Sequence, residues 1–377
     1  MKPKISFVKQ KLDELKEHDL HRSLRYGRVN GALIQFGSKN LVNFCSNDYL
    51  GLKSKKLSIG QVQSSSRLVS GNDPIFKKLE KYLARHKSQG RSLVFPTGYM
   101  ANIGAIPAVV NKNDVIFSDE LNHASIIEGC RLSNAKVVVY KHNNSGDLKS
   151  KIRNNHSGRK FIITEGVFSM DGDFAKLDEL TDIAKKNNAI IMIDDAHGDF
   201  TVGNDGKGTP KLFGVEKEID LYMSSLSKGL GSFGGYVAAE NEVIDLLINR
   251  SKAFIYTSAL PSVLAQISLD RLHQNREKRR KILERNVRLM SSNLRDIGYE
   301  IKSPSHIIPL VIGLEKKAVE FGTYLFENGI FAQPIRYPTV PLGSARVRIS
   351  VTAWLSKKQI EKATEIFRKA GKKFKII

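Results

Sequence analysis

Cysteine is nearly absent from this chain, which has only Cys45 and Cys130 among its 377 residues. Their positions show no metal-ligand spacing and provide no disulfide framework, so we expect both thiols to be reduced and structural and predict no metal site. Long hydrophobic runs are also missing. No apolar stretch approaches the roughly 20 residues of a membrane span, and Met1 to Lys4 lead into no signal-peptide core. These absences predict a soluble, cytoplasmic protein that binds no membrane.

Acidic residues are scarce relative to basic ones, with 38 Asp and Glu against 60 Lys and Arg and a formal net charge of +22. Such a balance is typical of nucleic-acid-binding proteins. However, zinc-finger spacing and the alternation of aromatic and basic residues seen in RNA-binding modules are both lacking. The basic cluster 276–281 lies in a long amphipathic helix predicted to begin near Pro261, so we expect its charges to face solvent. We therefore predict no nucleic-acid ligand, and the positive surface also suits a polyphosphate-bearing substrate or an acidic carrier protein.

No internal repeat or low-complexity linker interrupts the chain, whose hydrophobic content of 41% is that of a globular protein. Three regions are predicted: an N-terminal arm over 1–41, with a helix over 7–18 and a hairpin ending near Gly37; a large domain over 42–260; and a smaller α+β domain over 261–377. Strand-like runs alternate with helical patterns in the large domain, at 92–95, 115–118, 136–140, 161–164, 190–194 and 221–224. This alternation indicates an α/β fold with a mostly parallel sheet. The C-terminal elements are expected at 307–312, 316–328, 330–333, 346–351 and 357–370.

Two of these predicted strands end in chemically reactive groups. Residues 190–194 are followed by Asp195 and His197, with Asp194 at the strand end, and 221–224 are followed by Ser225 and Lys228. In open α/β sheets, ligands bind outside the carboxyl ends of the strands. A lysine there is a candidate nucleophile for a carbonyl, and a carboxylate is the partner that a pyridinium nitrogen needs. These two signals favour a pyridoxal phosphate site, although each also occurs in α/β proteins without that cofactor.

Two further stretches fit such a site. Thr97-Gly98-Tyr99 lies between a strand end and a helix start, where exposed backbone N–H groups bind anions such as phosphate. His123 is predicted at the start of the next helix, where an imidazole can stack on a flat ring or simply cap the helix. The loops 44–52 and 64–72 mix polar, aromatic and glycine residues and are candidates for substrate binding.

Six motifs in order along nearly the whole chain resemble the α-oxoamine synthases. They are Asn47-Asp48-Tyr49-Leu50-Gly51, Ser66-Arg67-Leu68-Val69-Ser70-Gly71, Asp119 with Asn122-His123-Ala124-Ser125, Thr164-Glu165-Gly166-Val167-Phe168-Ser169-Met170-Asp171-Gly172, Asp194-Asp195-Ala196-His197-Gly198 and Ser225-Leu226-Ser227-Lys228. The resemblance implies a fold-type I, aminotransferase-like α/β fold. It also implies an acyltransferase that uses pyridoxal 5'-phosphate to condense an amino acid with an acyl thioester and release carbon dioxide.

The loop 66–72 is most similar to the branch of that family that makes a biotin precursor from L-alanine and a pimeloyl thioester. The chain departs from the family pattern at 63–65 and 231–235, so glycine with acetyl-CoA stays an alternative substrate pair. Serine as the amino acid also stays open. The resemblance does not decide whether the acyl group arrives on coenzyme A or on a carrier protein.

The resemblance assigns roles around the cofactor ring to five residues. Lys228 would form the covalent link and then move the α-proton. Asp194 would pair with the ring nitrogen, while His123 stacks on the ring face. His197, with Ser169 nearby, would bind the phenolic oxygen of the ring.

The phosphate-binding residues implied by the resemblance are Gly98, Tyr99 and Ser225. Thr257 matches a residue that reaches the phosphate from the neighbouring subunit in relatives. The resemblance therefore implies a homodimer with shared active sites.

The substrate-binding residues implied by the resemblance lie near both ends of the chain. Arg348 would hold the carboxylate of the amino acid, since a planar guanidinium suits a carboxylate better than an ammonium does. Asn47 would assist it. Arg25 would take the distal carboxylate of a pimeloyl chain, with Arg22 equally well placed.

Overall fold

The structure, a computed structural model, describes residues 6–53, 64–155 and 158–377. The chain divides into two compact units. We call Asn47–Ser169 with Asp173–Arg280 the central unit, and Met1–Ser46, Met170–Gly172 and Lys281–Ile377 the terminal unit. Residues 42–46 thus belong with the chain termini, and residues 261–280 belong with the central unit.

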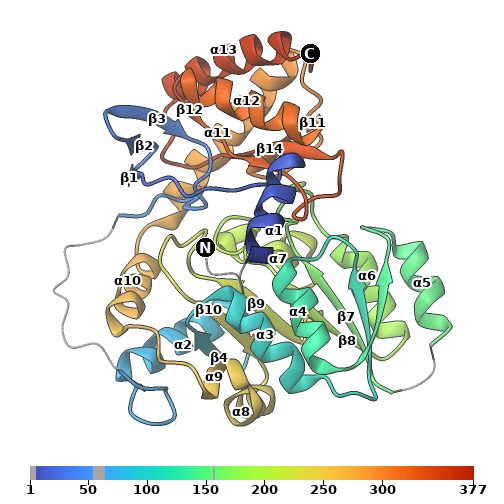
Figure 1. Cartoon of the computed structure of the whole chain (residues 1–377). Helices are drawn as coiled ribbons and strands as arrows, with labels where there is room; N and C mark the ends of the chain where they lie inside the picture. Colours follow the sequence, from blue (N-terminus) through green and yellow to red (C-terminus); the bar gives the residue numbers. More distant parts are fainter. Residues whose placement is uncertain (1–5, 54–63, 156–157) are drawn as a thin grey trace. The chain divides into compact units, whose positions relative to one another are not determined.

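A seven-stranded sheet forms the core of the central unit (Figure 1). Its strands are β4 Arg91–Phe95, β5 Val115–Asp119, β6 Lys136–Tyr140, β7 Lys160–Glu165, β8 Ala189–Asp194, β9 Leu221–Ser225 and β10 Gly235–Ala239, in the spatial order β4-β10-β9-β8-β7-β5-β6. The pairs formed among β5 to β9 are parallel, and β10 is antiparallel to both of its neighbours. The predicted fold class is confirmed, and six strands lie where the sequence predicts them. The prediction missed β10, whose five residues are all buried and therefore show no alternation.

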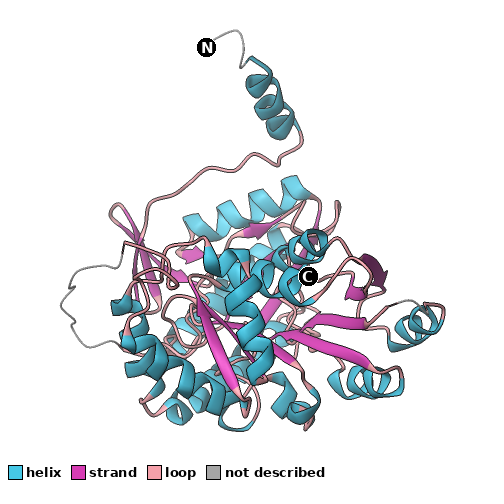
Figure 2. Ribbon diagram, turned by 90° about the horizontal axis from the view of Figure 1, so that it is seen from below, coloured by secondary structure: helices cyan, strands magenta, loops and turns pink. Residues whose placement is uncertain are grey.

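Helices cover both faces of this sheet (Figure 2). The helices of the central unit include α2 Pro74–Lys87, α3 Gly98–Val109, α4 Ala124–Ser133, α5 Ser145–Arg153, α6 Leu177–Lys186, α7 Thr209–Phe213, α8 Asn241–Arg250, α9 Lys252–Ile255 and α10 Ser262–Leu272. Helix α3 is the most apolar and is buried, since it lies between the strands and α4, α8 and α9. It packs on Phe95, Phe161 and Met192 of the strands, which have almost no solvent exposure. Burying each of these side chains stabilises the unit by about 1.5–3 kcal/mol, which fixes the sheet edge that carries the site.

The single long helix predicted from Pro261 is instead two helices, α10 and α11 Arg276–Asp296. The turn between them begins at His273, whose ring Nδ1 lies 2.7 Å from the Leu269 carbonyl oxygen. The expectation that cluster 276–281 faces solvent is wrong for Arg280, which is buried. Its neighbour Arg279 also bonds within the protein, since its Nε donates to the Leu50 carbonyl (2.6 Å). Long arginine stems bury their methylene groups readily, so an amphipathic pattern alone does not place their charges.

The terminal unit joins the two ends of the chain. Its elements are α1 Ser6–Glu17, β1 Arg28–Asn30, β2 Leu33–Phe36, β3 Lys39–Asn43, β11 Ile307–Gly313, α12 Glu315–Glu327, β12 Ile330–Phe331, β13 Pro334–Ile335, β14 Ala345–Ser350 and α13 Lys357–Lys373. Strand β3 pairs in parallel with β12, which brings the N-terminal hairpin against the C-terminal elements (Figure 1). The predicted N-terminal helix and hairpin and the predicted C-terminal elements are all present. None of the helices in the described ranges is long and apolar enough to cross a membrane.

Candidate active site

The carboxyl ends of β8 and β9 carry the two groups that the sequence analysis singled out. Asp194 is the last residue of β8, and its register partner in β9 is Met223. Strand β9 ends at Ser225, and Lys228 follows in the next turn. The two strands are parallel neighbours with largely buried residues. The sheet therefore delivers a carboxylate and an amine to the same edge.

A chain of hydrogen bonds begins at the Lys228 amine. Its Nζ lies 2.9 Å from Nε2 of His197, and Nδ1 of His197 lies 2.7 Å from the hydroxyl of Tyr49. That hydroxyl donates to Oδ1 of Asn47 (3.1 Å). If Lys228 donates as an ammonium, these hydrogen bonds run in one direction: Nε2 of His197 accepts, Nδ1 donates to Tyr49, and Tyr49 donates to Asn47. His197 is then a neutral imidazole with a fixed orientation, which the structure places between the amine and a buried tyrosine.

The Asp194 carboxylate is held in place on both oxygens. Oδ1 accepts from the backbone N–H of Ala196 (2.9 Å), and Oδ2 accepts from Nδ2 of Asn102 (2.6 Å). Nδ2 of Asn102 also donates to the hydroxyl of Ser125 (2.8 Å). Asn102 is itself buried, and its Oδ1 accepts no hydrogen bond from any described residue. The sequence analysis missed Asn102. It is a single polar residue in an apolar helix, and the pattern of that helix does not show that its side chain reaches Asp194.

His123 is the N-cap of α4, and it also belongs to this hydrogen-bond system. Its Nδ1 accepts from the Ser125 backbone N–H (3.2 Å) and lies 2.8 Å from the Ser125 hydroxyl. Burial lowers the pKa of His123, the Asp194 carboxylate raises it, and the Lys228 charge lowers it further. The net effect is a lowered pKa, so His123 is a neutral ring with its proton on Nε2. His123 thus caps the helix, as one of the two interpretations predicts, and its stacking on a cofactor ring stays a prediction.

Glu165 is a fully buried acid that the sequence analysis quoted only as part of a motif. It ends β7 and is the register partner of Asp194. Burial raises its pKa well above the ordinary value, and the Asp194 charge raises it further. Both effects favour the neutral form of Glu165.

The start of α3, at Gly98, is a candidate anion cradle. Thr97 caps the helix by accepting from the Met100 N–H (3.1 Å), and Gly98 begins it. A Cβ atom on Gly98 would lie 3.0 Å from Cβ of Ser225, and one on Gly235 would lie only 2.5 Å from N and Cα of Gly98. The two glycines therefore allow the helix start, the end of β9 and the start of β10 to approach closely. Backbone N–H groups at such a helix start bind phosphate.

The segment from Asp194 at the end of β8 to Phe200 contributes to two groups of contacts. Asp194 and His197 belong to the site described above, whereas Asp195 and Asp199 join a buried network inside the unit. Asp199 lies 2.5 Å from the Lys87 amine, 3.0 Å from Nε2 of His86 and 2.5 Å from the Tyr236 hydroxyl that donates to it. This network anchors the loop through buried contacts inside the unit.

The second acid of that network, Asp195, bridges neighbouring segments. It accepts from the Tyr222 hydroxyl (2.7 Å) and from the N–H and hydroxyl of Thr209 (2.8 and 3.0 Å). Burial raises the pKa of Asp195 to about 7. Lys87 also donates to the Tyr222 hydroxyl (2.6 Å), so both acids share one buried cation. Sequence reasoning missed this network, because its members come from segments far apart in the chain.

The remaining predicted site residues lie in different parts of the chain. Ser169 and Thr257 belong to the central unit: Ser169 is buried beyond β7, and Thr257 is half-buried beyond α9. Arg25 and Arg348 belong to the terminal unit, where Arg348 lies on β14 and donates to the Ser350 hydroxyl (3.1 Å). Within the central unit the structure thus brings His123, Asp194, His197 and Lys228 to one edge. No group of three or more His, Cys, Asp or Glu side chains suited to a metal ion occurs among the described residues.

Comparisons with known proteins identify the family of the chain. Residues 39–367 match the family model for aminotransferase class I and II. The chain is 41% identical to 8-amino-7-oxononanoate synthase of Thermoanaerobacter pseudethanolicus, over 99% of this chain and 98% of that protein. Among solved structures, serine palmitoyltransferase of Sphingomonas wittichii superposes with a TM-score of 0.91 at 26% identity, covering 100% of this chain and 99% of that one. The 8-amino-7-oxononanoate synthase of Francisella tularensis gives a TM-score of 0.75 at 28% identity, covering 89% of this chain and 99% of that one.

Proposed function

Because the chain belongs to the class I and II aminotransferase family, and within it to the α-oxoamine synthases, we propose that it is an 8-amino-7-oxononanoate synthase. It would condense L-alanine with a pimeloyl thioester, release carbon dioxide and supply a precursor of biotin. The observation that carries this proposal is the set of Asp194, His197 and Lys228 at adjacent strand ends, in a chain 37–41% identical to relatives with that name.

The described residues fit pyridoxal 5'-phosphate. Its phosphate suits the cradle at Gly98, where glycines leave no side chain between the helix start and Ser225. Its ring nitrogen suits the Asp194 carboxylate, which Asn102 and the Ala196 N–H hold in place. When bound, this group supplies an electron sink for the negative charge that develops at the amino acid's α-carbon.

Around that group, each side chain has a defined task. Lys228 would hold the cofactor covalently and, once displaced by the amino acid, remove the α-proton. Its hydrogen bond to His197 orients the amine and offers a path for a proton. Asp194 would place its carboxylate at the ring nitrogen, while burial favours the neutral form of Glu165 on the neighbouring strand.

The carboxylate of L-alanine is assigned to Arg348, assisted by Asn47. Arg348 lies on β14 and donates to the Ser350 hydroxyl (3.1 Å). Its planar guanidinium suits a carboxylate better than an ammonium would.

A cavity in the terminal unit supports the pimeloyl chain as the acyl group. Its volume is about 460 Å³, and Arg22, Arg25 and Arg336 line it. Arg336 is only 7% exposed, and its Nε has no hydrogen-bond partner in the described parts of the chain. Arg25 lies over the Phe326 ring at 4.7 Å, and Arg22 donates to the Tyr337 carbonyl (2.9 Å). A cavity lined by arginines suits the distal carboxylate of a pimeloyl chain, which an acetyl group lacks.

The assembly is proposed to be a cytoplasmic homodimer. Thr257, the residue assigned to the phosphate of the partner subunit, follows Tyr256, whose side chain is 81% exposed. Large exposed aromatic residues are enriched in protein interfaces. Sedimentation of Tyr256→Asp, which would place a charge in that interface, tests the assembly: the variant should sediment as a monomer.

A substrate screen tests the reaction. L-alanine, glycine and L-serine are each combined with pimeloyl-CoA, pimeloyl carrier protein and acetyl-CoA, and carbon dioxide and free thiol are measured. We expect turnover with L-alanine and a pimeloyl thioester. Faster turnover of glycine with acetyl-CoA would overturn the assignment and support the other branch of the family.

A further inference from the structure

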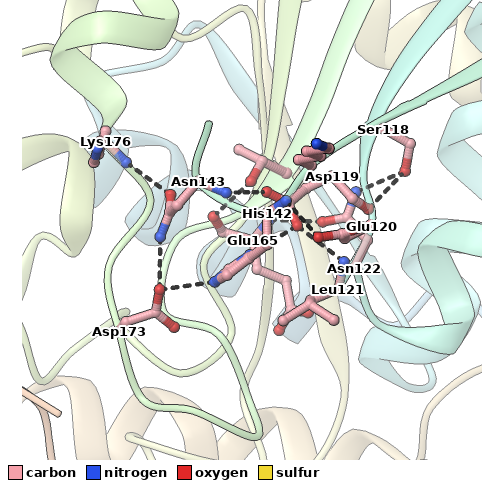
Figure 3. A network of polar contacts seen from close by, with 12 residues as sticks. Ser118, Asp119, Glu120, Leu121, Asn122, His142, Asn143, Glu165, Asp173 and Lys176 are labelled. Atoms are coloured by element: carbon pink, nitrogen blue, oxygen red, sulfur yellow. Dashed lines mark hydrogen bonds and ion pairs between the residues drawn. The ribbon is translucent and has the colours of Figure 1, made fainter. Parts of the chain in front are cut away.

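A polar cluster lies at the carboxyl edge formed by β5, β6 and β7, beside the residues discussed above (Figure 3). At its centre is His142, just beyond the edge strand β6. Its Nδ1 lies 2.9 Å from Oδ1 of Asp119, the last residue of β5. Its Nε2 lies 2.9 Å from Oδ2 of Asp173, in the segment that follows β7. One ring thus bridges two segments that are far apart in the chain.

The protonation state of His142 follows from its partners. A carboxylate oxygen accepts hydrogen bonds and donates none, so a ring nitrogen facing it must carry a proton. Both nitrogens of His142 face carboxylates, and the ring is therefore an imidazolium. Burial alone would lower the pKa of His142, but the hydrogen bonds to Asp119 and Asp173 raise it to about 10. The bridge is charged throughout the physiological range.

The first carboxylate fixes the segment that leads to His123. Oδ1 of Asp119 also accepts from the N–H of Leu121 (2.9 Å), two residues before His123. The next residue, Asn122, donates from Nδ2 to the Ser118 hydroxyl (2.9 Å) and the Ile163 carbonyl (2.8 Å). The orientation of the Asp119 carboxylate thus sets where the chain enters α4.

The second carboxylate fixes the segment that carries Ser169. The Asp173 carbonyl accepts from the N–H of Phe168 (3.0 Å), the residue before Ser169, and its carboxylate accepts from Nδ2 of Asn143 (2.6 Å). The Phe168 ring also meets the His142 ring edge-on at 4.4 Å between centroids. His142 and its neighbour therefore contact this segment through polar and aromatic groups.

We propose that the His142 imidazolium is a positioning residue that holds together the two segments presenting His123 and Ser169 to the cofactor. Its link to the cofactor rests on the proposed function, whereas the charged bridge itself does not. Without the bridge, Asp119 and Asp173 would face each other across the edge with no cation between them, and repulsion would separate the segments.

Three variants separate positioning from general stability. His142→Gln keeps a similar size but provides one donor group and no charge, so it cannot satisfy both carboxylates. His142→Arg keeps the charge and offers several donors, and it should restore the bridge. The control is His273→Gln, which makes the same chemical change at an exposed ring that bonds the Leu269 carbonyl.

Two measurements on the full-length protein test the proposal. The first is NMR of the ring nitrogens in ¹⁵N-histidine-labelled protein, with and without pyridoxal phosphate. We expect one imidazolium near pH 8, absent from the His142→Gln spectrum. The second is the dissociation constant and visible circular dichroism of bound pyridoxal phosphate. We expect His142→Gln to bind it about tenfold more weakly, a typical cost of losing a residue that orients site ligands, with an altered circular dichroism band. His142→Arg and His273→Gln should match the wild type in both properties.

The outcomes are distinct. A neutral His142 near pH 8 would refute the charged bridge. Cofactor affinity and circular dichroism unchanged in His142→Gln, or changed equally in His142→Arg, would refute the positioning role. Wild-type protein that binds no pyridoxal phosphate would refute the proposed function and the positioning role with it, while the NMR result would still decide whether the bridge exists.

Discussion

Replacing Lys87 with methionine tests whether the buried network beneath the site anchors it. The Lys87 amine lies 2.5 Å from Asp199, 2.6 Å from the Tyr222 hydroxyl and 2.9 Å from the Lys207 carbonyl. Methionine fills a similar volume but donates no hydrogen bond. Asp199 would then be a buried charge without its principal cation, which typically costs about 3–5 kcal/mol.

The structure also contains a partial compensation. Burial and the neighbouring Lys87 charge lower the pKa of His86 to about 4, and His86 lies 3.0 Å from Asp199. Once the Lys87 charge is gone, His86 is easier to protonate and can take over part of its role. We therefore expect a loss near the lower end of that range, about 3 kcal/mol.

The assay is thermal unfolding of the full-length protein without cofactor, with Lys151→Met as the control. Lys151 pairs with Asp147 at 2.8 Å across one helical turn of α5, with both side chains partly exposed, a contact worth about 0.3–0.5 kcal/mol. At about 2–4 °C per kcal/mol for a unit of this size, Lys87→Met should lower the midpoint by about 6–12 °C and the control by less than about 2 °C. Equal shifts in the two variants would refute the anchoring argument.

Three further predictions concern the cradle, the bridge and the surface charge. Gly235→Ala would bring a Cβ within 2.5 Å of Gly98 and should weaken pyridoxal phosphate binding, measured by titration, at least tenfold. Gly146→Ala should not, because its added Cβ would lie 3.3 Å from Oδ1 of Asn144. Equal affinities would count against the cradle. The pKa of His142 in the folded protein is raised from the ordinary 6.5 to about 10, so its stabilisation is complete below pH 6.5 and is lost as pH rises through 10. The difference in unfolding midpoint between wild type and His142→Gln should therefore shrink between these two pH values. A constant difference would contradict the assignment. If the net charge of +22 steers an anionic acyl donor to the protein, added salt should screen this attraction and lower kcat/KM for that donor. The KM for L-alanine should change little. Equal salt responses for the two substrates would exclude steering.

The sequence predicted what depends on local pattern. Apolar runs that end abruptly in charged residues located β8 and β9, and with them Asp194 and Lys228. The prediction missed β10, because five consecutive buried residues after a glycine-rich turn show no period. Arg280 was predicted to face solvent but is buried, because its burial depends on what packs against the start of α11 and not on helix periodicity.

The supporting residues of the site could not be predicted, because they depend on contacts between distant segments. Asn102 reaches Asp194 across 92 positions of the chain, and Tyr49 reaches His197 across 148. No local pattern encodes such pairs. The raised pKa of Glu165 likewise follows from its burial and from its register opposite Asp194, which only the sheet order reveals.

The most direct test of the central claim is to locate the lysine that holds the cofactor. The purified protein is incubated with pyridoxal phosphate, reduced with borohydride to make the attachment permanent, and digested for peptide mass mapping. The account predicts one modified lysine, Lys228, and no modification in Lys228→Ala. Attachment at a different lysine, such as Lys87, or no attachment in the wild type would contradict it.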